Sequence, residues 1–109
     1  MFVVNLSTET AAIVEGSLLK LSGSIGMDSV AGLYRQGLTS LEDPIEKVDC
    51  RAITSGDSAC LALLLFLQSK IDTPLILIGL PPSLKVLVDL YCLSELFSFS
   101  EDTALSASH

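Results

Sequence analysis

The chain has 109 residues and a mass of 11.5 kDa, which suits one domain of roughly 100–150 residues. Half of its residues are hydrophobic and 17% are charged, so it is not an intrinsically disordered chain, which would combine low hydrophobicity with high charge. Six basic residues against 13 acidic ones give a net charge of −7. Because the basic residues are also scattered, we expect no binding to nucleic acid and no direct adsorption to anionic lipid.

The N-terminal part predicts a β-hairpin. Residues 11–14 and 18–21 are rich in apolar side chains, and the intervening Glu15-Gly16-Ser17 is typical of a tight turn. Residues 1–6 are also mostly apolar but are followed by polar residues. We therefore expect residues 1–9 to form either an edge strand or a loose N-terminal arm.

A first helix and a further strand are expected next. The helix follows Gly26, has about a dozen residues, is capped by Asp28 or Ser29, and is ended by Pro44. Apolar and charged residues then alternate over residues 45–50, which predicts a strand that continues weakly to residue 53. The apolar residues that recur at helical spacing in the first helix are Val30, Leu33, Tyr34, Leu38 and Leu41.

The central segment predicts a loop and a second, very apolar helix. Thr54-Ser55-Gly56 is expected to be the loop, and Asp57 and Ser58 are expected to cap a helix that ends near Lys70. The longest uninterrupted apolar run covers residues 59–67. It is too short to cross a membrane, which needs about 20 apolar residues, so we expect a soluble, cytosolic protein.

The C-terminal part completes an alternating pattern of strands and helices. Residues 75–78 are continuously apolar, as in a strand buried on both faces of a sheet, and Pro81-Pro82 starts a third helix. Residues 96–99 predict a short strand or docked coil. The order predicts an α/β domain over residues 10–99, with a mixed, largely parallel sheet, and a polar tail at residues 100–109.

The chain offers few residues for catalysis. Its one histidine is His109, and it has no glycine-rich phosphate loop, so we expect a non-enzymatic protein without cofactor or metal. Cys50, Cys60 and Cys92 are odd in number and have no C-x-x-C spacing, which favours buried thiols in a reducing compartment. The helix dipole could lower the pKa of Cys60, but a buried packing residue is the preferred interpretation.

The apolar residues of the central helix divide between two faces at 100° per residue. One face carries Leu61, Leu64, Leu65 and Gln68, and the other carries Ala59, Ala62, Leu63, Phe66 and Lys70. A helix on one sheet layer buries a single stripe, so either a neighbouring helix covers the second stripe or Leu63 and Phe66 are exposed. We favour a partner-binding surface, because few other elements are left to cover it. The same stripe could also pair two copies into a homodimer in isolation.

Asp57 and Ser58 have two interpretations. They can simply cap the helix, or Ser58 can also contact a partner or accept a phosphate at the positive end of the helix.

Three segments are similar to the STAS domain, the module shared by sulfate transporters and anti-sigma factor antagonists. They are residues 18–23, residues 47–50 and the junction Gly56–Leu64, and the resemblance extends over residues 10–98. It implies a STAS-like mixed sheet with helices packed mainly on one face.

Within this family, residues 61–65 and 84–93 most resemble the MlaB group. This resemblance implies a non-catalytic cytoplasmic accessory subunit that binds the MlaF-like ATPase of an ABC transporter for phospholipids, which maintains the lipid asymmetry of the outer membrane. Such a subunit would be peripheral to the inner membrane, reaching it only through the complex. The family has a threonine at the ATPase contact where Ser58 stands here. The expected partner-binding residues are Asp57, Ser58, Ala59, Ala62, Leu63 and Phe66.

Two other functions stay open. One is an anti-sigma factor antagonist controlled by serine phosphorylation. In such antagonists the regulated serine precedes a glycine, whereas Ala59 and Cys60 occupy these positions here, which leaves Ser58 as the possible phosphorylation site. The other is a free-standing sensor of a small molecule or nucleotide.

Overall fold

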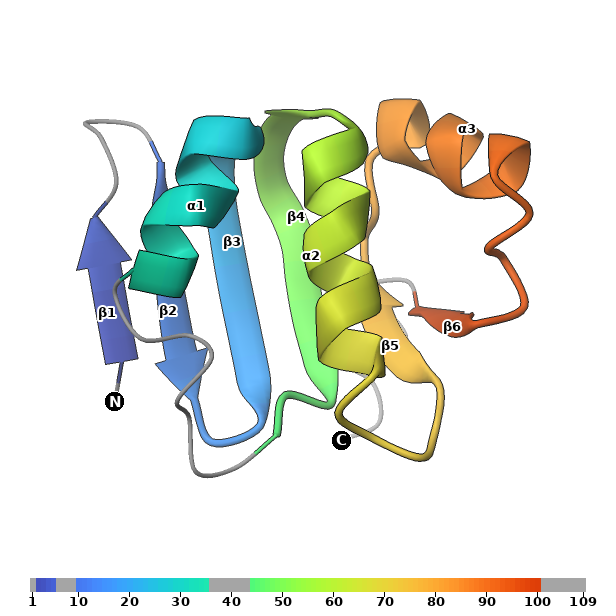
Figure 1. Cartoon of the computed structure of the whole chain (residues 1–109), viewed down its shortest axis with the longest axis horizontal. Helices are drawn as coiled ribbons and strands as arrows, with labels where there is room; N and C mark the ends of the chain where they lie inside the picture. Colours follow the sequence, from blue (N-terminus) through green and yellow to red (C-terminus); the bar gives the residue numbers. More distant parts are fainter. Residues whose placement is uncertain (1, 6–9, 36–43, 101–109) are drawn as a thin grey trace.

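A six-stranded sheet and three helices make up the described part of the chain, residues 2–5, 10–35 and 44–100 of the computed structural model (Figure 1). The expected helical positions Leu38 and Leu41 lie outside this part, as does most of the C-terminal tail. In chain order the elements are β1 (Phe2–Asn5), β2 (Ala11–Glu15), β3 (Leu18–Ile25), α1 (Met27–Arg35), β4 (Lys47–Gly56), α2 (Ser58–Gln68), β5 (Leu75–Ile78), α3 (Pro82–Leu90) and β6 (Phe97–Ser100).

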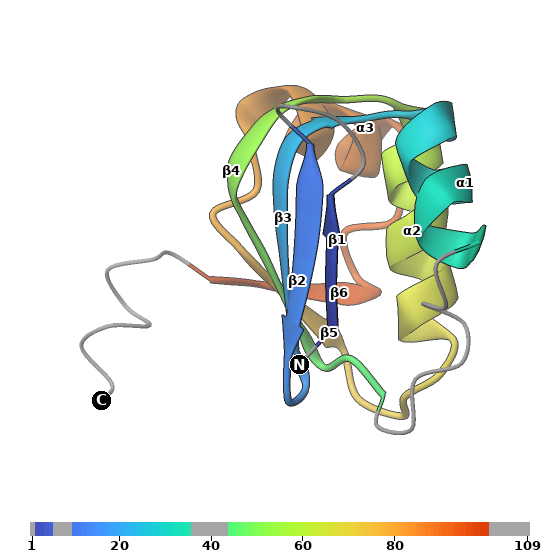
Figure 2. The same ribbon diagram turned by 90° about the vertical axis from the view of Figure 1, so that its left-hand side faces the viewer.

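The strand order across the sheet follows the chain from β1 to β6. β1, β2 and β3 pair antiparallel, and β3 to β6 pair parallel through three helical crossovers. Because crossovers share one handedness and the order never reverses, the crossover helices belong on one face of the sheet. α1 and α2 lie side by side on that face (Figure 2). The predicted mixed sheet with helices mainly on one face is confirmed.

Most predicted elements are present. The hairpin turns at Gly16, whose φ of 63° is costly for any other residue. Residues 2–5 form an edge strand rather than a loose arm, and residues 97–100 form a strand rather than coil.

Two local predictions are wrong. Residues 54–56 are strand instead of loop, because β3 continues to Ile25 and its parallel pairing extends β4 as far as Gly56. Neither Asp28 nor Ser29 caps α1, since the helix already begins at Met27. The Ser29 hydroxyl instead donates to the Ser24 carbonyl at 2.9 Å.

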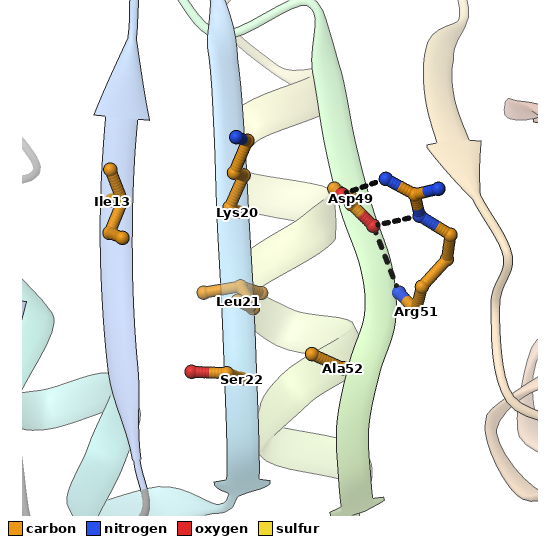
Figure 3. Close-up of a pocket in the computed structure, with 7 residues that line it drawn as sticks. All are labelled: Ile13, Lys20, Leu21, Ser22, Asp49, Arg51 and Ala52. Carbon is orange, nitrogen blue, oxygen red and sulfur yellow. Dashed lines mark hydrogen bonds and ion pairs between the residues drawn. The ribbon is translucent and has the colours of Figure 1, made fainter. Parts of the chain in front are cut away.

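The other face of the sheet carries no helix in the described part of the chain. Lys20, Ser22, Asp49 and Ala52 line a shallow hollow of about 450 Å³ there (Figure 3). Arg51 Nη2 and Nε donate to Asp49 at 2.8 and 3.0 Å, and these hydrogen bonds hold the pKa of Asp49 below its usual value. The pair balances its own charge, so the hollow offers no unpaired carboxylate.

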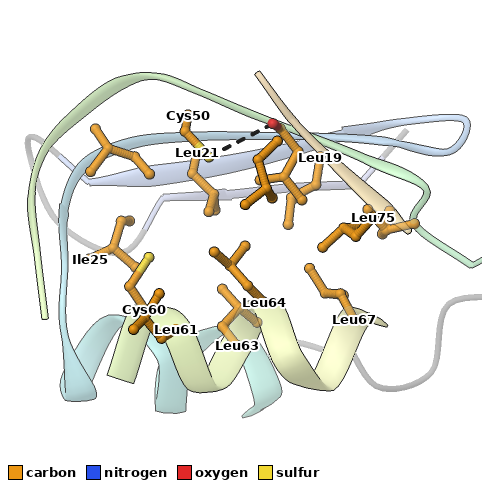
Figure 4. Packing of buried hydrophobic residues seen from close by; sticks show 14 of the residues in the cluster. Leu19, Leu21, Ile25, Cys50, Cys60, Leu61, Leu63, Leu64, Leu67 and Leu75 are labelled. Atoms are coloured by element: carbon orange, nitrogen blue, oxygen red, sulfur yellow. Dashed lines mark hydrogen bonds between the residues drawn. The ribbon is translucent and has the colours of Figure 1, made fainter. Parts of the chain in front are cut away.

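The core lies between the sheet and α2 (Figure 4). Leu19, Leu21 and Ile25 of β3 and Leu75 of β5 face the helix and are at most 1% exposed. The residues of α2 that enter this core are Cys60, Leu61, Leu63, Leu64 and Leu67.

The expected exposure of Leu63 is wrong, because its side chain is 0% exposed. α2 has a flanking helix on each side, α1 and α3, and therefore buries an arc wider than one stripe. Phe66, assigned to the same stripe, is half-buried with its ring centroid 5.4 Å from that of Tyr34 of α1. A neighbouring helix thus covers part of the second stripe, while Ala62 and Lys70 stay exposed, so the outcome lies between the two alternatives.

We predict that Leu63→Ala lowers the free energy of unfolding by about 2–5 kcal/mol, because it leaves a cavity in a packed core. Leu90→Ala removes the same atoms from a side chain that is 67% exposed, and it should change stability by less than about 0.5 kcal/mol. Urea unfolding followed by circular dichroism measures both. Equal losses for the two variants would contradict the burial of Leu63.

Candidate partner-binding site

The junction between β4 and α2 is fixed by Asp57. Its Oδ1 accepts a hydrogen bond from the Ala59 backbone N–H at 2.9 Å, as expected of a helix N-cap. A Cβ built on Gly56 would come within 3.0 Å of the Leu84 side chain of α3, and one on Gly26 within 3.4 Å of the Asp57 carboxylate. The junction is therefore packed between the start of α1 and α3, which makes its position rigid.

Ser58 is the first residue of α2 and is exposed. Within the described residues its hydroxyl makes no hydrogen bond, since Asp57 alone performs the capping. The prediction that both residues cap the helix is therefore confirmed only for Asp57. The Ser58 hydroxyl is free to contact a partner or to accept a phosphate.

The solvent side of α2 is narrow and uncharged. Ser58, Ala62 and Ser69 are exposed, and Leu65 and Phe66 are half-buried between them. These five residues, which we call the α2 outer face, recur at the spacing of one helix side. Small side chains at Ser58 and Ala62 allow another helix to approach the backbone closely.

Five of the six expected partner-binding residues are at least partly accessible at this place. Asp57, Ser58 and Ala62 are exposed, and Phe66 is half-buried beside the Lys70 amine, which lies 5.1 Å from its ring centroid. Ala59 is half-buried. Leu63 is in the core, and it cannot contact a partner unless the helix moves.

A second surface was missed by the sequence reasoning. Five of the six large hydrophobic side chains that are exposed in the described residues fall within residues 86–99. The signal was present in α3, where Val86 and Leu90 are four residues apart and outside the stripe of Leu84 and Val88. The five residues are Val86, Leu90, Tyr91, Leu96 and Phe99.

A hollow of about 580 Å³ lies at the carboxyl ends of β4 and β5. It is lined by Gly79, Pro81 and Phe99, with the Lys85 amine 4.5 Å above the Phe99 ring centroid. Arg51, which also lines it, is held by Asp49. Both basic groups are thus already engaged, and the hollow shows no catalytic arrangement. No group of three potential metal ligands is found among the described residues.

Cys50 and Cys60 lack the properties of catalytic thiols. Burial raises the pKa of Cys60 to about 12. The pKa of Cys50 is also raised, mainly by burial and to a smaller extent by the nearby Cys60. The packing interpretation of Cys60 is confirmed by its 0% exposure. Cys92, expected to be buried, is exposed, because it follows α3 at a turn with a φ of 58°.

The chain was compared with known families and proteins. A family model described as "Mlab, STAS domain" matches residues 9–98. No curated protein matches the chain. Within the described residues, no helix has the length and apolar character needed to cross a membrane.

We predict that a thiol reagent such as DTNB titrates one thiol in the native protein and three after unfolding. Cys92 is exposed, whereas Cys50 and Cys60 are buried and protonated at neutral pH. Cys92→Ser should leave no rapidly reacting thiol in the native protein. A second fast-reacting thiol in that variant would show that the core opens readily.

Proposed function

We propose, from the premise that the chain belongs to the STAS domain family of the Mlab type, that it is a non-catalytic accessory subunit of an ABC transporter for phospholipids. In this role it binds the cytoplasmic ATPase of the complex and supports transport that maintains the lipid asymmetry of the outer membrane. It reaches the inner membrane only through that complex.

The observation that carries the proposal is the α2 outer face with Ser58 at its start. This position resembles that of the family's threonine at the ATPase contact. The capping bond of Asp57 holds the position rigidly, so little conformational entropy is lost on binding. The five residues of the face carry no charge, which suits the desolvated centre of an interface, and the Lys70 amine over the Phe66 ring lies at its border.

The burial of Leu63 changes how the contact is made. Exposed Ala62 and half-buried Leu65 and Phe66 supply its apolar part, and the hydroxyl of Ser58 supplies its polar part. Phe66 is already braced by Tyr34, so its exposed edge is presented in one orientation. We therefore assign the ATPase contact to a narrow strip along α2 with α1 at its border.

We predict that Ala62→Arg weakens binding to the ATPase of the organism's own phospholipid transporter about 100-fold or more. The long charged side chain would stand in the centre of the α2 outer face and would have to be desolvated without a partner. Ala52→Arg is the matched control, because Ala52 is also exposed but lies on the helix-free face of the sheet. Co-purification and calorimetry measure both variants.

The outcomes test the proposed contact surface and the proposed accessory role separately. Equal binding by the two variants would contradict the α2 outer face as the contact. Absence of any binding between the unaltered chain and the ATPase would contradict the accessory role itself. Circular dichroism of the free variants confirms that each is folded.

The exposed hydroxyl of Ser58 also favours a second candidate, an anti-sigma factor antagonist. A phosphate on this hydroxyl would lie at the positive end of α2, although the adjacent Asp57 carboxylate would repel it. Incubation with the organism's anti-sigma kinases and ATP, followed by intact mass measurement, discriminates the two. One added phosphate that Ser58→Ala abolishes would support the antagonist, and no added phosphate would favour the transporter subunit.

A further inference from the structure

The outer edge of β6 ends the sheet without a neighbour in the described part of the chain. β6 pairs with β5 on one side only, in the register Ile76 with Ser98 and Ile78 with Ser100. An open edge leaves a row of backbone donors and acceptors that another strand can bind.

The orientation of these groups follows from one hydrogen bond. The Gly79 N–H donates to the Ser100 carbonyl at 2.9 Å, so Ser100 directs its backbone groups toward the β5 side. Since alternate residues of a strand face the same neighbour, Ser98 does the same, and the backbone groups of Phe97 and Phe99 point to the open edge.

β6 is only four residues long, but it lacks the side chains that normally protect an edge. Its sequence is Phe-Ser-Phe-Ser, without charge or proline. Leu96, which directly precedes β6, and Phe99 within it are 44% and 36% exposed. The edge therefore combines free hydrogen-bonding groups with uncovered apolar side chains.

We propose that β6 pairs antiparallel with β6 of a second copy of this chain, with Ser98 opposite Ser98. A two-fold axis makes the two strands antiparallel, and the outward-facing residues Phe97 and Phe99 are placed symmetrically about Ser98. Each Phe97 then lies opposite Phe99 of the second copy as a hydrogen-bonded pair, which gives four backbone hydrogen bonds. The two sheets become one continuous sheet of twelve strands, two copies of the six in each chain.

The side chains agree with this register. Phe97 faces the core and Phe99 lies on the same side of the strand, 6.5 Å away between ring centroids. Across the junction, residues directly opposite share a face, so Phe99 would lie beside Phe97 of the second copy. The exposed Ser98 side chains would meet on the opposite face, about 4.5 Å apart between Cα atoms.

The dimer should be weak and should tighten with salt. Three paired residues in each copy bury far less than the roughly 1,200–2,000 Å² of stable interfaces, so we expect dissociation constants in the micromolar range. Each copy carries a net charge of −7, and salt screens the repulsion between the copies. An interface held by ion pairs would show the opposite salt dependence.

Introducing a charge of either sign at Ser98 tests the register. Ser98→Lys and Ser98→Glu each place like charges opposite one another across the two-fold axis, and each should weaken dimerisation at least about 10-fold. An equimolar mixture should recover a heterodimer. Sedimentation equilibrium measures the constants, and native mass spectrometry identifies the mixed species. Ser83→Lys, on an exposed serine of α3, is the matched control and should dimerise as the unaltered chain does.

The proposal is independent of the ATPase contact, so Ala62→Arg should leave the dimer unchanged. A monomeric unaltered chain at about 100 μM would overturn the proposal. Undiminished dimerisation of Ser98→Lys, or loss of the dimer in Ala62→Arg, would also overturn it by placing the interface elsewhere. If Ser98→Lys instead loses binding to the ATPase while the unaltered chain is monomeric, the edge belongs to that partner and the proposal is wrong.

Discussion

Five side chains of α2 lose nearly all contact with water when the helix packs against the sheet between α1 and α3. Each such burial is worth about 1.5–3 kcal/mol, so together they match in size the whole net stability of a small domain, about 5–15 kcal/mol. The helix cannot rotate without exposing some of them. This packing fixes the direction in which Ser58 and Ala62 point, and it makes the start of α2 a rigid platform.

The position of each helix in the layer explains where apolar surface remains. α2 lies in the middle and has a helix on either side, so it buries a wide apolar arc. Its exposed side is narrow and carries small side chains. α3 contacts α2 on one side only, and Val86 and Leu90 on its outer side stay exposed. β6 occupies the corresponding end of the sheet. Apart from Met27 at the start of α1, the large apolar side chains that are exposed in the described residues therefore belong to residues 86–99, away from the outer face of the central helix.

The hydrophobic pattern predicted the elements well because each has a clear period and clear ends, such as the Asp57 cap and the apolar run at residues 75–78. It failed where neighbours decide the outcome. Residues 54–56 look like a loop in isolation, and only pairing with β3 makes them strand. A helical wheel placed Leu63 on the exposed side because it assumes that a helix buries one stripe. In the structure α1 and α3 flank α2, so this helix buries a wider arc. The pattern could indicate a candidate site at the start of α2, but which leucines of this helix are accessible depends on packing.

The distribution of charge limits how this domain can recognise partners. Lys20 and Arg51 pair with Glu15 and Asp49, and Lys70 and Lys85 lie over aromatic rings, so most basic groups act within the chain. The net charge of −7 leaves an acidic excess over the chain as a whole, while the five residues of the α2 outer face carry no charge. Long-range attraction of a basic partner would then govern the rate and selectivity of encounter, while the small uncharged contact governs affinity. A partner with negative charge around its docking site would meet repulsion from the net charge of −7 before reaching the α2 outer face.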